Sequence, residues 1–309
     1  MHNPRWLATA IAGTVVALAS VSPAAAAPLP ITYGAPYAYL VGGSQLTASP
    51  PGANDWSCKP TAAHPYPVVL VHQTASTAEL NWIDLSPYLK NQGYCVFALT
   101  YGVDPSVSPV IGGIADLDQS AAQVAAFVNQ VLAATGASKV DMVGHSQGGV
   151  ISREFIQELG GANEVNTMVL LASPWAVAGG DNLGDLANLL LGEAPPVVTQ
   201  AIAGVNAATL PFLQLFDDPA YWAKLNAVDY GTSPGVRYVE ITSHADEISY
   251  ISDYVTPPVT NASLEWVQDA CPLAWPDHET IPYNATAVAM IANALDPAQA
   301  VTPPCSLSS

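Results

Sequence analysis

Short apolar runs of strand length recur along the chain, and segments with the period of a helix separate them. The apolar runs cover residues 67–72, 94–99, 139–143, 167–172 and 236–242. A run without polar alternation is typical of a strand buried on both faces, as in a parallel sheet. The helical segments are 81–91, 114–134, 148–159 and 283–294. Strands alternating with helices predict an α/β fold whose mostly parallel sheet is covered by helices on both faces.

The connection between the last two of these runs is longer and more apolar than a plain crossover needs. Leucine, valine and aromatic residues recur through an insertion at about 175–230. One interpretation is a helical cap, fixed or moving as a lid, that forms an acyl-binding pocket at the sheet edge. The other is ordinary helix-packing surface that belongs to the core. We expect the cap, because an insertion at this point of such a sheet usually covers the site.

The chain begins with the parts of a secretory signal peptide. Arg5 supplies a positive charge, residues 6–21 are apolar, and small residues at 24–27 precede Pro28. A charged start, a short apolar core and an A-x-A site are removed on export. We therefore expect a signal peptide at 1–27 and a single secreted, extracellular domain at 28–309. The first part of that domain, 28–57, is rich in Pro, Gly, Tyr and Ser and is expected to be an extended arm lying on it.

The net charge of the chain limits the partners that it can bind. The chain has 7 Lys and Arg against 25 Asp and Glu, which gives a net charge of −18. Loss of Arg5 with the signal peptide makes it −18 − 1 = −19. Such a surface repels nucleic acid and anionic membranes, so no nucleic-acid partner is expected. Half of the residues are hydrophobic, which suits one large globular domain with a full core.

The four cysteines are Cys58, Cys95, Cys271 and Cys305. An even number in an exported protein indicates disulfides, and four cysteines allow three pairings. We expect Cys58–Cys95 and Cys271–Cys305, because each closes a loop of modest length. A metal site is the less favoured interpretation, since the chain has no C-x-x-C pair and its histidines are scattered.

A G-x-S-x-G pattern at residues 144–148 organises the candidate chemistry. It lies between the strand-like run 139–143 and the helical segment 148–159. A serine between strand and helix sits on a sharp turn with its hydroxyl exposed at the end of the sheet. The helix start also directs free N–H groups and a positive dipole end toward the serine. We therefore expect Ser146 to be a catalytic nucleophile, although the pattern also occurs by chance in Gly-rich loops.

A catalytic base and an acid follow from chain order, because in this arrangement the acid and then the histidine come after the serine. His278 is the histidine that follows every plausible acid, in a loop between the strand-like segment 264–268 and the helix 283–294. Asp246 directly follows the run 236–242, so its loop lies at the sheet edge that carries Ser146. Glu247 is expected to point elsewhere. The remaining candidates for the acid are Asp253, Asp269 and Asp277.

An oxyanion hole needs two N–H donors. One is the backbone of Gln147, directly after the serine, and the other comes from the loop after the first core strand, at Gln73 and Thr74. Serine catalysis of this kind requires no metal or organic cofactor, so none is expected.

Several stretches together resemble the secreted actinobacterial lipases of the α/β-hydrolase superfamily. They are 54–60, 67–72, Asn81-Trp82, 93–97 and 144–148. More distantly the chain is similar to Candida antarctica lipase B, on 146–149, 245–248 and 277–278. The resemblance implies an α/β-hydrolase fold and a triad of Ser146, Asp246 and His278. It also implies an oxyanion hole at Thr74 and Gln147, and a pocket lined by Trp175 and Ile248.

Two positions depart from that pattern. Gln73 stands where these families have Gly, so a positive φ there would strain the loop, and the Gln side chain is a candidate to reach the site. His145 stands where the yeast lipase has Trp, which predicts a roomier or more polar pocket on the alcohol side.

These observations predict a secreted monomer that hydrolyses lipid or ester substrates, with transient contact with a lipid interface. A cutinase-like polyesterase, a short-chain carboxylesterase or an acyltransferase would keep the same triad and change the substrate. A non-catalytic exported binding protein is the alternative from another class, if Gln73 has cost the activity.

Overall fold

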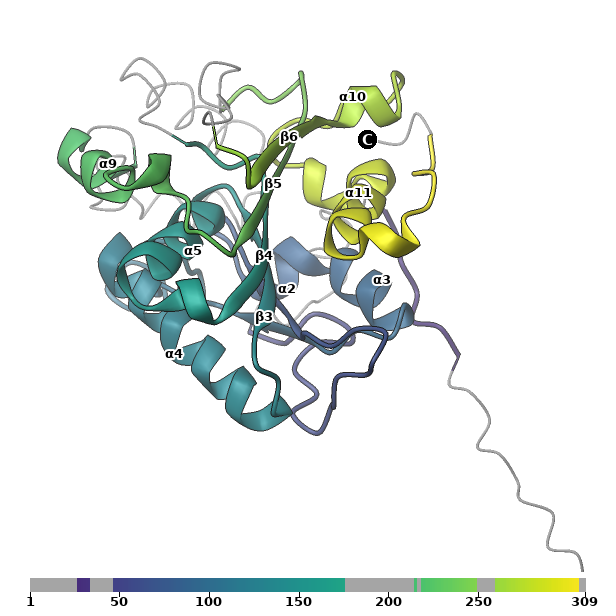
Figure 1. Ribbon diagram of the computed structural model, residues 1–309, viewed down its shortest axis with the longest axis horizontal. Coiled ribbons are helices and arrows are strands. Elements are labelled where there is room, and N and C mark those ends of the chain that lie inside the picture. Colours follow the sequence, from purple (N-terminus) through teal and green to yellow (C-terminus); the bar gives the residue numbers. More distant parts are fainter. Residues whose placement is uncertain (1–26, 34–46, 176–213, 216–217, 249–258, 306–309) are drawn as a thin grey trace, which may run out of the picture.

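The computed structural model describes residues 27–33, 47–175, 214–215, 218–248 and 259–305 (Figure 1). The predicted signal peptide and most of the predicted cap therefore lie outside the described residues. No helix in the described parts is long and apolar enough to span a membrane.

A six-stranded sheet forms the centre of the described fold, in the order β2-β1-β3-β4-β5-β6. Every pairing between neighbouring strands is parallel, as the apolar runs predicted. The strands are β1 (Val68–Val71), β2 (Val96–Leu99), β3 (Val140–His145), β4 (Val165–Leu171), β5 (Arg237–Thr242) and β6 (Ala262–Trp266). Because parallel strands end at the same edge, the loops that follow them meet there.

Helices cover both faces of the sheet (Figure 1). Alternate residues of β1 belong to two separate cores: Val69 and Val71 to one, Val68 and Leu70 to the other. One core is shared with α4 (Leu117–Thr135) and α5 (Gln147–Glu158). The other is shared with α2 (Ala78–Trp82), α3 (Leu85–Asn91), α10 (Val267–Ala270) and α11 (Ala285–Leu295). α9 (Pro219–Leu225) packs beside α5. Two apolar faces on one strand explain why the run 67–72 shows no alternation.

The single helix predicted at 81–91 is wrong, because the structure has α2 and α3 there with a break at residues 83–84. Pro87 supplies a physical reason: without an N–H it cannot bond to the carbonyl four residues earlier. In the first turn of α3 that bond is not needed. At the break, the Asp84 carboxylate instead accepts the backbone N–H of Thr32 at 3.0 Å, which fastens the N-terminal arm.

The arm also covers the edge of the sheet at β2. Asn54 pairs with the backbone of Ala98 through both amide atoms, at 2.8 and 2.9 Å, and its own N–H donates to Val96 at 2.9 Å. An uncovered edge strand would invite pairing with another chain. The disulfide Cys58–Cys95 fastens the same arm beside β2, and Cys271–Cys305 fastens the C-terminal segment, which is the predicted pairing.

Asn54 has a φ of 60°, in the left-handed region that Asn tolerates better than most residues. We expect Asn54→Ala to lose the two side-chain hydrogen bonds to Ala98 and the one to Ser49, and to add backbone strain, costing about 2–4 kcal/mol of unfolding free energy. Asn54→Gly is the matched control, since it loses the same bonds without the strain. Thermal unfolding should rank parent, Gly variant, Ala variant in falling stability. Equal stability of all three would show that the arm does not hold the edge.

Candidate active site

Ser146 sits on a sharp turn between β3 and α5, with φ 52° and ψ −123°. This backbone conformation is sparsely populated for a residue with a side chain and persists only where its surroundings enforce it. The flanking glycines allow the close packing: a Cβ on Gly148 would lie 2.2 Å from the Val71 carbonyl oxygen, and one on Gly144 would lie 2.6 Å from Gly149 Cα. The G-x-S-x-G pattern thus reflects two points where backbones touch. Ser146 itself is half-buried.

Backbone contacts from the next strand hold this turn. The Ser146 N–H donates to the Leu171 carbonyl at 2.9 Å, and the Ser146 carbonyl accepts the Ser173 hydroxyl at 2.9 Å. The Ser173 N–H donates in turn to the buried carboxyl group of Glu240 at 3.0 Å. Ser173 and Glu240 were not identified from the sequence. In the sequence, the position of Ser173 two residues after a buried strand could have pointed to it.

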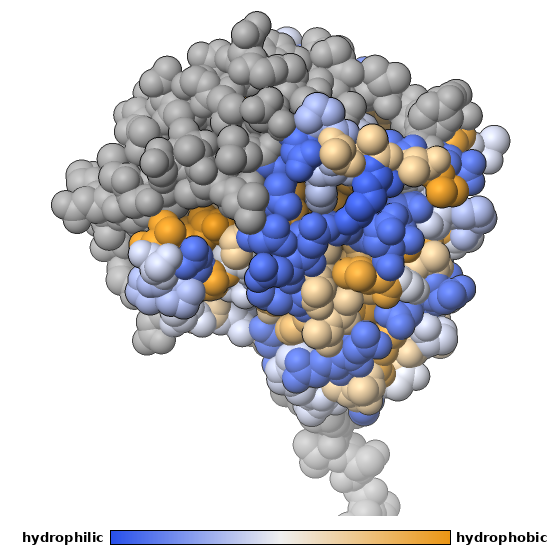
Figure 2. Space-filling view, turned by 90° about the vertical axis from the view of Figure 1, so that its left-hand side faces the viewer, coloured by the Kyte–Doolittle hydropathy of each residue, from blue (hydrophilic) through white to orange (hydrophobic). Residues whose placement is uncertain are grey.

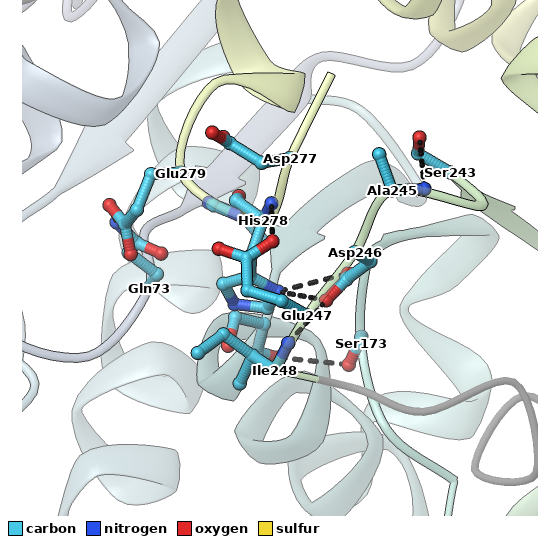
Figure 3. A network of polar contacts seen from close by, with 12 residues as sticks. Gln73, Ser173, Ser243, Ala245, Asp246, Glu247, Ile248, Asp277, His278 and Glu279 are labelled. Carbon is cyan, nitrogen blue, oxygen red and sulfur yellow. Dashed lines mark hydrogen bonds and ion pairs between the residues drawn. The ribbon is translucent and has the colours of Figure 1, made fainter. Parts of the chain in front are cut away.

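Asp246 and His278 meet in the interior although they are far apart in the chain. His278 Nδ1 lies 3.0 Å from each carboxylate oxygen of Asp246, and the two side chains are only 2% and 1% exposed (Figure 3). The Ile248 N–H donates to Asp246 Oδ1 at 3.0 Å and fixes the carboxylate further. The loop after β5 and the loop before α11 therefore bring together the predicted acid and the predicted base.

The charges around His278 decide its protonation. Burial opposes the imidazolium form, but the Asp246 carboxylate and its hydrogen bond outweigh burial, and Glu279 and Glu247 add to the effect. Together they hold the pKa of His278 above its usual value. Neutral His278, the form that can accept a proton, is therefore expected on the alkaline side of the usual histidine range.

A tight turn carries the histidine. The Asp277 carboxylate accepts the Thr280 N–H at 2.7 Å and the Thr280 hydroxyl at 2.6 Å, with His278 and Glu279 between them. The His278 N–H donates to the Glu247 carboxylate at 3.3 Å. The expectation that Glu247 points elsewhere is therefore wrong, since its carboxylate reaches back to the base loop. Burial raises the pKa of Glu247.

The predicted oxyanion donors lie in the loop after β1 and at the start of α5. α5 begins at Gln147, so the Gln147 N–H is a first-turn donor that lacks an intrahelical partner. In the loop, the left-handed φ of 52° falls on Ala75, and Gln73 is not among the residues with positive φ. The strain considered for Gln73 is therefore absent. Thr74 is half-buried between these two residues.

His145 lies beneath the base rather than at an open pocket wall. It is fully buried, with Nε2 3.1 Å from the His278 carbonyl oxygen and Nδ1 3.2 Å from Asn81 Oδ1. Burial holds the pKa of His145 well below its usual value, so the ring is neutral. This placement differs from the role on the alcohol side that the resemblance suggested, and makes His145 a support for the His278 loop.

Trp175 and Ile248, the two pocket residues that the resemblance implied, are each 5% exposed. The Trp175 indole N–H donates to Glu240 at 3.2 Å, and the guanidinium carbon of Arg153 lies 4.1 Å from the centre of its ring. These contacts anchor Trp175 in the core. Its contact with substrate stays a prediction, because residues 176–213 lie outside the described part of the chain.

Among the described residues, no group of three or more His, Cys, Asp or Glu is arranged to hold a metal ion.

Comparison with known proteins gives matches in sequence and in fold. Residues 65–176 match the family model for Lipase (class 2). A triacylglycerol lipase of Pseudarthrobacter phenanthrenivorans is 39% identical over 98 residues, which are 30% of this chain and 28% of that protein. One of Burkholderia plantarii is also 39% identical over 98 residues, 30% of this chain and 25% of the relative. The match thus spans little more than a quarter of either relative's length.

Solved structures extend the likeness over most of the chain. Aspergillus fumigatus lipase B has a TM-score of 0.57 and 19% identity, covering 84% of this chain and 57% of that one. An esterase from a Rhodococcus species has a TM-score of 0.50 and 17% identity, covering 79% of this chain and 94% of that one. At this identity the likeness concerns the fold. The parallel sheet and these solved structures give the chain an α/β-hydrolase fold, and its residues 65–176 are similar to the class 2 lipases.

Proposed function

We propose that the mature protein is a secreted serine hydrolase that cleaves carboxylic esters, most of all acylglycerols, as a lipase. The observation that carries the proposal is the buried Asp246–His278 pair, with both 3.0 Å contacts, on loops that follow the turn of Ser146 in the chain. The match to Lipase (class 2) over 65–176 supports the reaction type. The relatives named triacylglycerol lipase support acylglycerols as the substrate class.

The proton on His278 determines its role. Because Nδ1 faces the Asp246 carboxylate, the neutral ring carries its proton there and keeps a lone pair on Nε2. Nε2 takes the proton of the Ser146 hydroxyl as the serine oxygen attacks the ester carbonyl carbon. A new C–O bond forms, and the electrons of the carbonyl π bond move to its oxygen. Asp246 stabilises the imidazolium that results.

The oxyanion formed in this step needs donors that are already in place. The N–H groups of Gln147 and Thr74 are our candidates, one at the positive end of α5 and one on the loop after β1. When the intermediate collapses, His278 gives its proton to the departing alcohol. A water molecule, deprotonated by His278, then attacks the acyl-enzyme and releases the acid and Ser146.

The disulfides and the surface of the protein bear on where it acts. Two disulfides suit an oxidising compartment outside the cell, in line with the predicted signal peptide. Hydrophilic residues cover much of the described face in Figure 2, with apolar residues in small groups between them. We propose a monomer that meets its lipid substrate transiently. The non-catalytic alternative supposes that Gln73 has cost the activity, and the absence of a positive φ at Gln73 removes one way in which it could do so.

Substitution of the nucleophile tests the reaction. We expect Ser146→Ala to lower kcat for p-nitrophenyl esters by about 10⁶-fold, because no other group forms the acyl-enzyme. A fluorescent phosphonate that reacts with active serines should label the parent and leave Ser146→Ala unlabelled. Assays across acyl lengths divide the substrate classes: a maximum at long chains supports a lipase, and one at short chains supports an esterase. A labelled Ser146→Ala would refute this assignment of the nucleophile.

The pH profile tests the buried pair. Because the neutral ring is the active form, kcat/KM should rise with pH through the raised pKa of His278. Asp246→Asn removes the largest source of that elevation, so the rising limb should move to lower pH. The plateau should fall by about 10⁴-fold, because the tautomer and the imidazolium are no longer stabilised. Steady-state rates between about pH 5 and pH 10 measure both effects, and a limb unmoved in Asp246→Asn would contradict the assignment of the acid.

A further inference from the structure

The side chain of Gln73 links two loops that are far apart in the sequence. Its Nε2 donates to Glu279 Oε2 at 2.6 Å, across a separation of 206 residues. Gln73 lies in the loop after β1, and Glu279 directly follows His278. In Figure 3 this contact lies on the opposite side of His278 from Asp246. Gln73 is 8% exposed, so the bond forms largely out of solvent, where a charge-assisted hydrogen bond is strong.

Both ends of this contact are held in place. The Gln73 N–H donates to Asn81 Oδ1 at 3.0 Å, and its carbonyl accepts the His72 Nδ1 proton at 2.6 Å. Glu279 belongs to the turn closed by Asp277 and Thr280, so its direction is fixed relative to His278. The Gln73–Glu279 bond therefore joins two rigid segments, and a change at either end is transmitted to the other.

A second path joins the same two loops from below. Asn81 Oδ1, which receives the Gln73 N–H, also lies 3.2 Å from His145 Nδ1. His145 Nε2 lies 3.1 Å from the His278 carbonyl oxygen. Both of these neighbours are acceptors, and a neutral His145 carries a single N–H, so it donates to only one of them. The loop after β1 thus reaches the His278 backbone through Asn81 and the packed His145 ring, and it reaches Glu279 through Gln73.

We propose that Gln73 and Glu279 form a latch that sets the position of the Thr74 N–H relative to His278, so that both are positioning residues. The inference rests on the proposed function, because it matters where an oxyanion donor and a base act on one substrate. Neither residue need touch the substrate. A shift of about 1 Å between donor and base is enough to slow such a reaction strongly. The Gln, in place of the Gly of the resembled families, supplies the side chain for this contact.

The carboxylates that act on His278 are Asp246 and Glu247 from the loop after β5 and Glu279 from its own turn, while the Asp277 carboxylate in that turn binds Thr280. The neutral His145 ring packs against it with ring centres 5.2 Å apart. Burial raises the pKa of Glu279, while the charge of His278 and the Gln73 hydrogen bond lower it. The Gln73 hydrogen bond thus acts together with the charge of His278 against the effect of burial on the pKa of Glu279.

An exchange of the two side chains tests the latch. Gln73→Glu places two carboxylates in contact, and we expect kcat on a p-nitrophenyl ester to fall by about tenfold or more, with a smaller change in KM. The double variant Gln73→Glu with Glu279→Gln recreates the bond with donor and acceptor exchanged. It should recover kcat to within about threefold of the parent and regain most of the loss in Tm.

The control pairs Gln73→Glu with Glu247→Gln, which removes another of the carboxylates that act on His278 but leaves the latch broken. This variant should stay as slow as Gln73→Glu. Recovery here as well would mean that total charge and not the latch matters, and would overturn the proposal. It is also overturned if Gln73→Glu keeps the parent kcat, or if the exchanged pair regains neither kcat nor Tm.

Phosphonate labelling separates the two levels of inference. An unlabelled, folded parent would refute the proposed function. The contact between Gln73 and Glu279 would then be tested by Tm alone. The double variant should still regain most of the Tm that Gln73→Glu loses. A labelled parent whose exchanged pair shows no recovery would refute the latch and leave the proposed function standing.

Discussion

The left-handed backbone at Ser146 is the constraint on which the rest of the site depends. It is held by hydrogen bonds to Leu171 and Ser173 and by the start of α5 against β1, with Gly148 packed on the Val71 carbonyl. That contact requires β1 beside β3, which is the observed order of the sheet. β4 and β5 follow on the other side, so Ser173 and Asp246, which come after these strands, reach the same edge. The strand order thus supports the strained turn at Ser146 and also brings Ser173 and Asp246 to the same edge of the sheet.

Burial of the acid and base adds a second constraint. Removing both Asp246 and His278 from solvent is costly, and the pair is tolerated because each charge has hydrogen-bonding partners. The carboxylates of Glu247 and Glu279 lie beside this pair, in a protein whose net charge is −18. Together with Asp246 they favour the imidazolium form of His278, so less of the ring is neutral at neutral pH.

Most of the fold could be predicted from the sequence, because buried parallel strands have an unmistakable apolar pattern. The runs that contain Val68 to Val71 and Val140 to Val143 are examples. The break at residues 83–84 was missed because the apolar spacing continues across it. The pairing of Asp246 with His278 was predictable from chain order, since the order of the strands determines which loops reach the serine.

The supporting contacts could not be predicted in the same way. Glu279 and Glu247 look like surface residues in the sequence, and only the path of the two loops brings them to Gln73 and to the His278 backbone. His145 was read by its place beside the serine, whereas its ring packs under the base. Such contacts depend on the relative position of loops to within an ångström, which residue patterns do not encode.

A site built from loops this far apart needs ties between them, and glutamine amides supply two. Gln268 in α10 donates to the Ser243 hydroxyl at 2.8 Å and to the Ala274 carbonyl at 3.0 Å, which ties the acid loop to the segment before His278. Gln73 ties the loop after β1 to Glu279, the residue directly after His278. The base loop is thus held from both sides, with the Cys271–Cys305 disulfide at its start. Because these ties form on folding, the fold itself fixes the relative position of the loops that carry Thr74, Asp246 and His278.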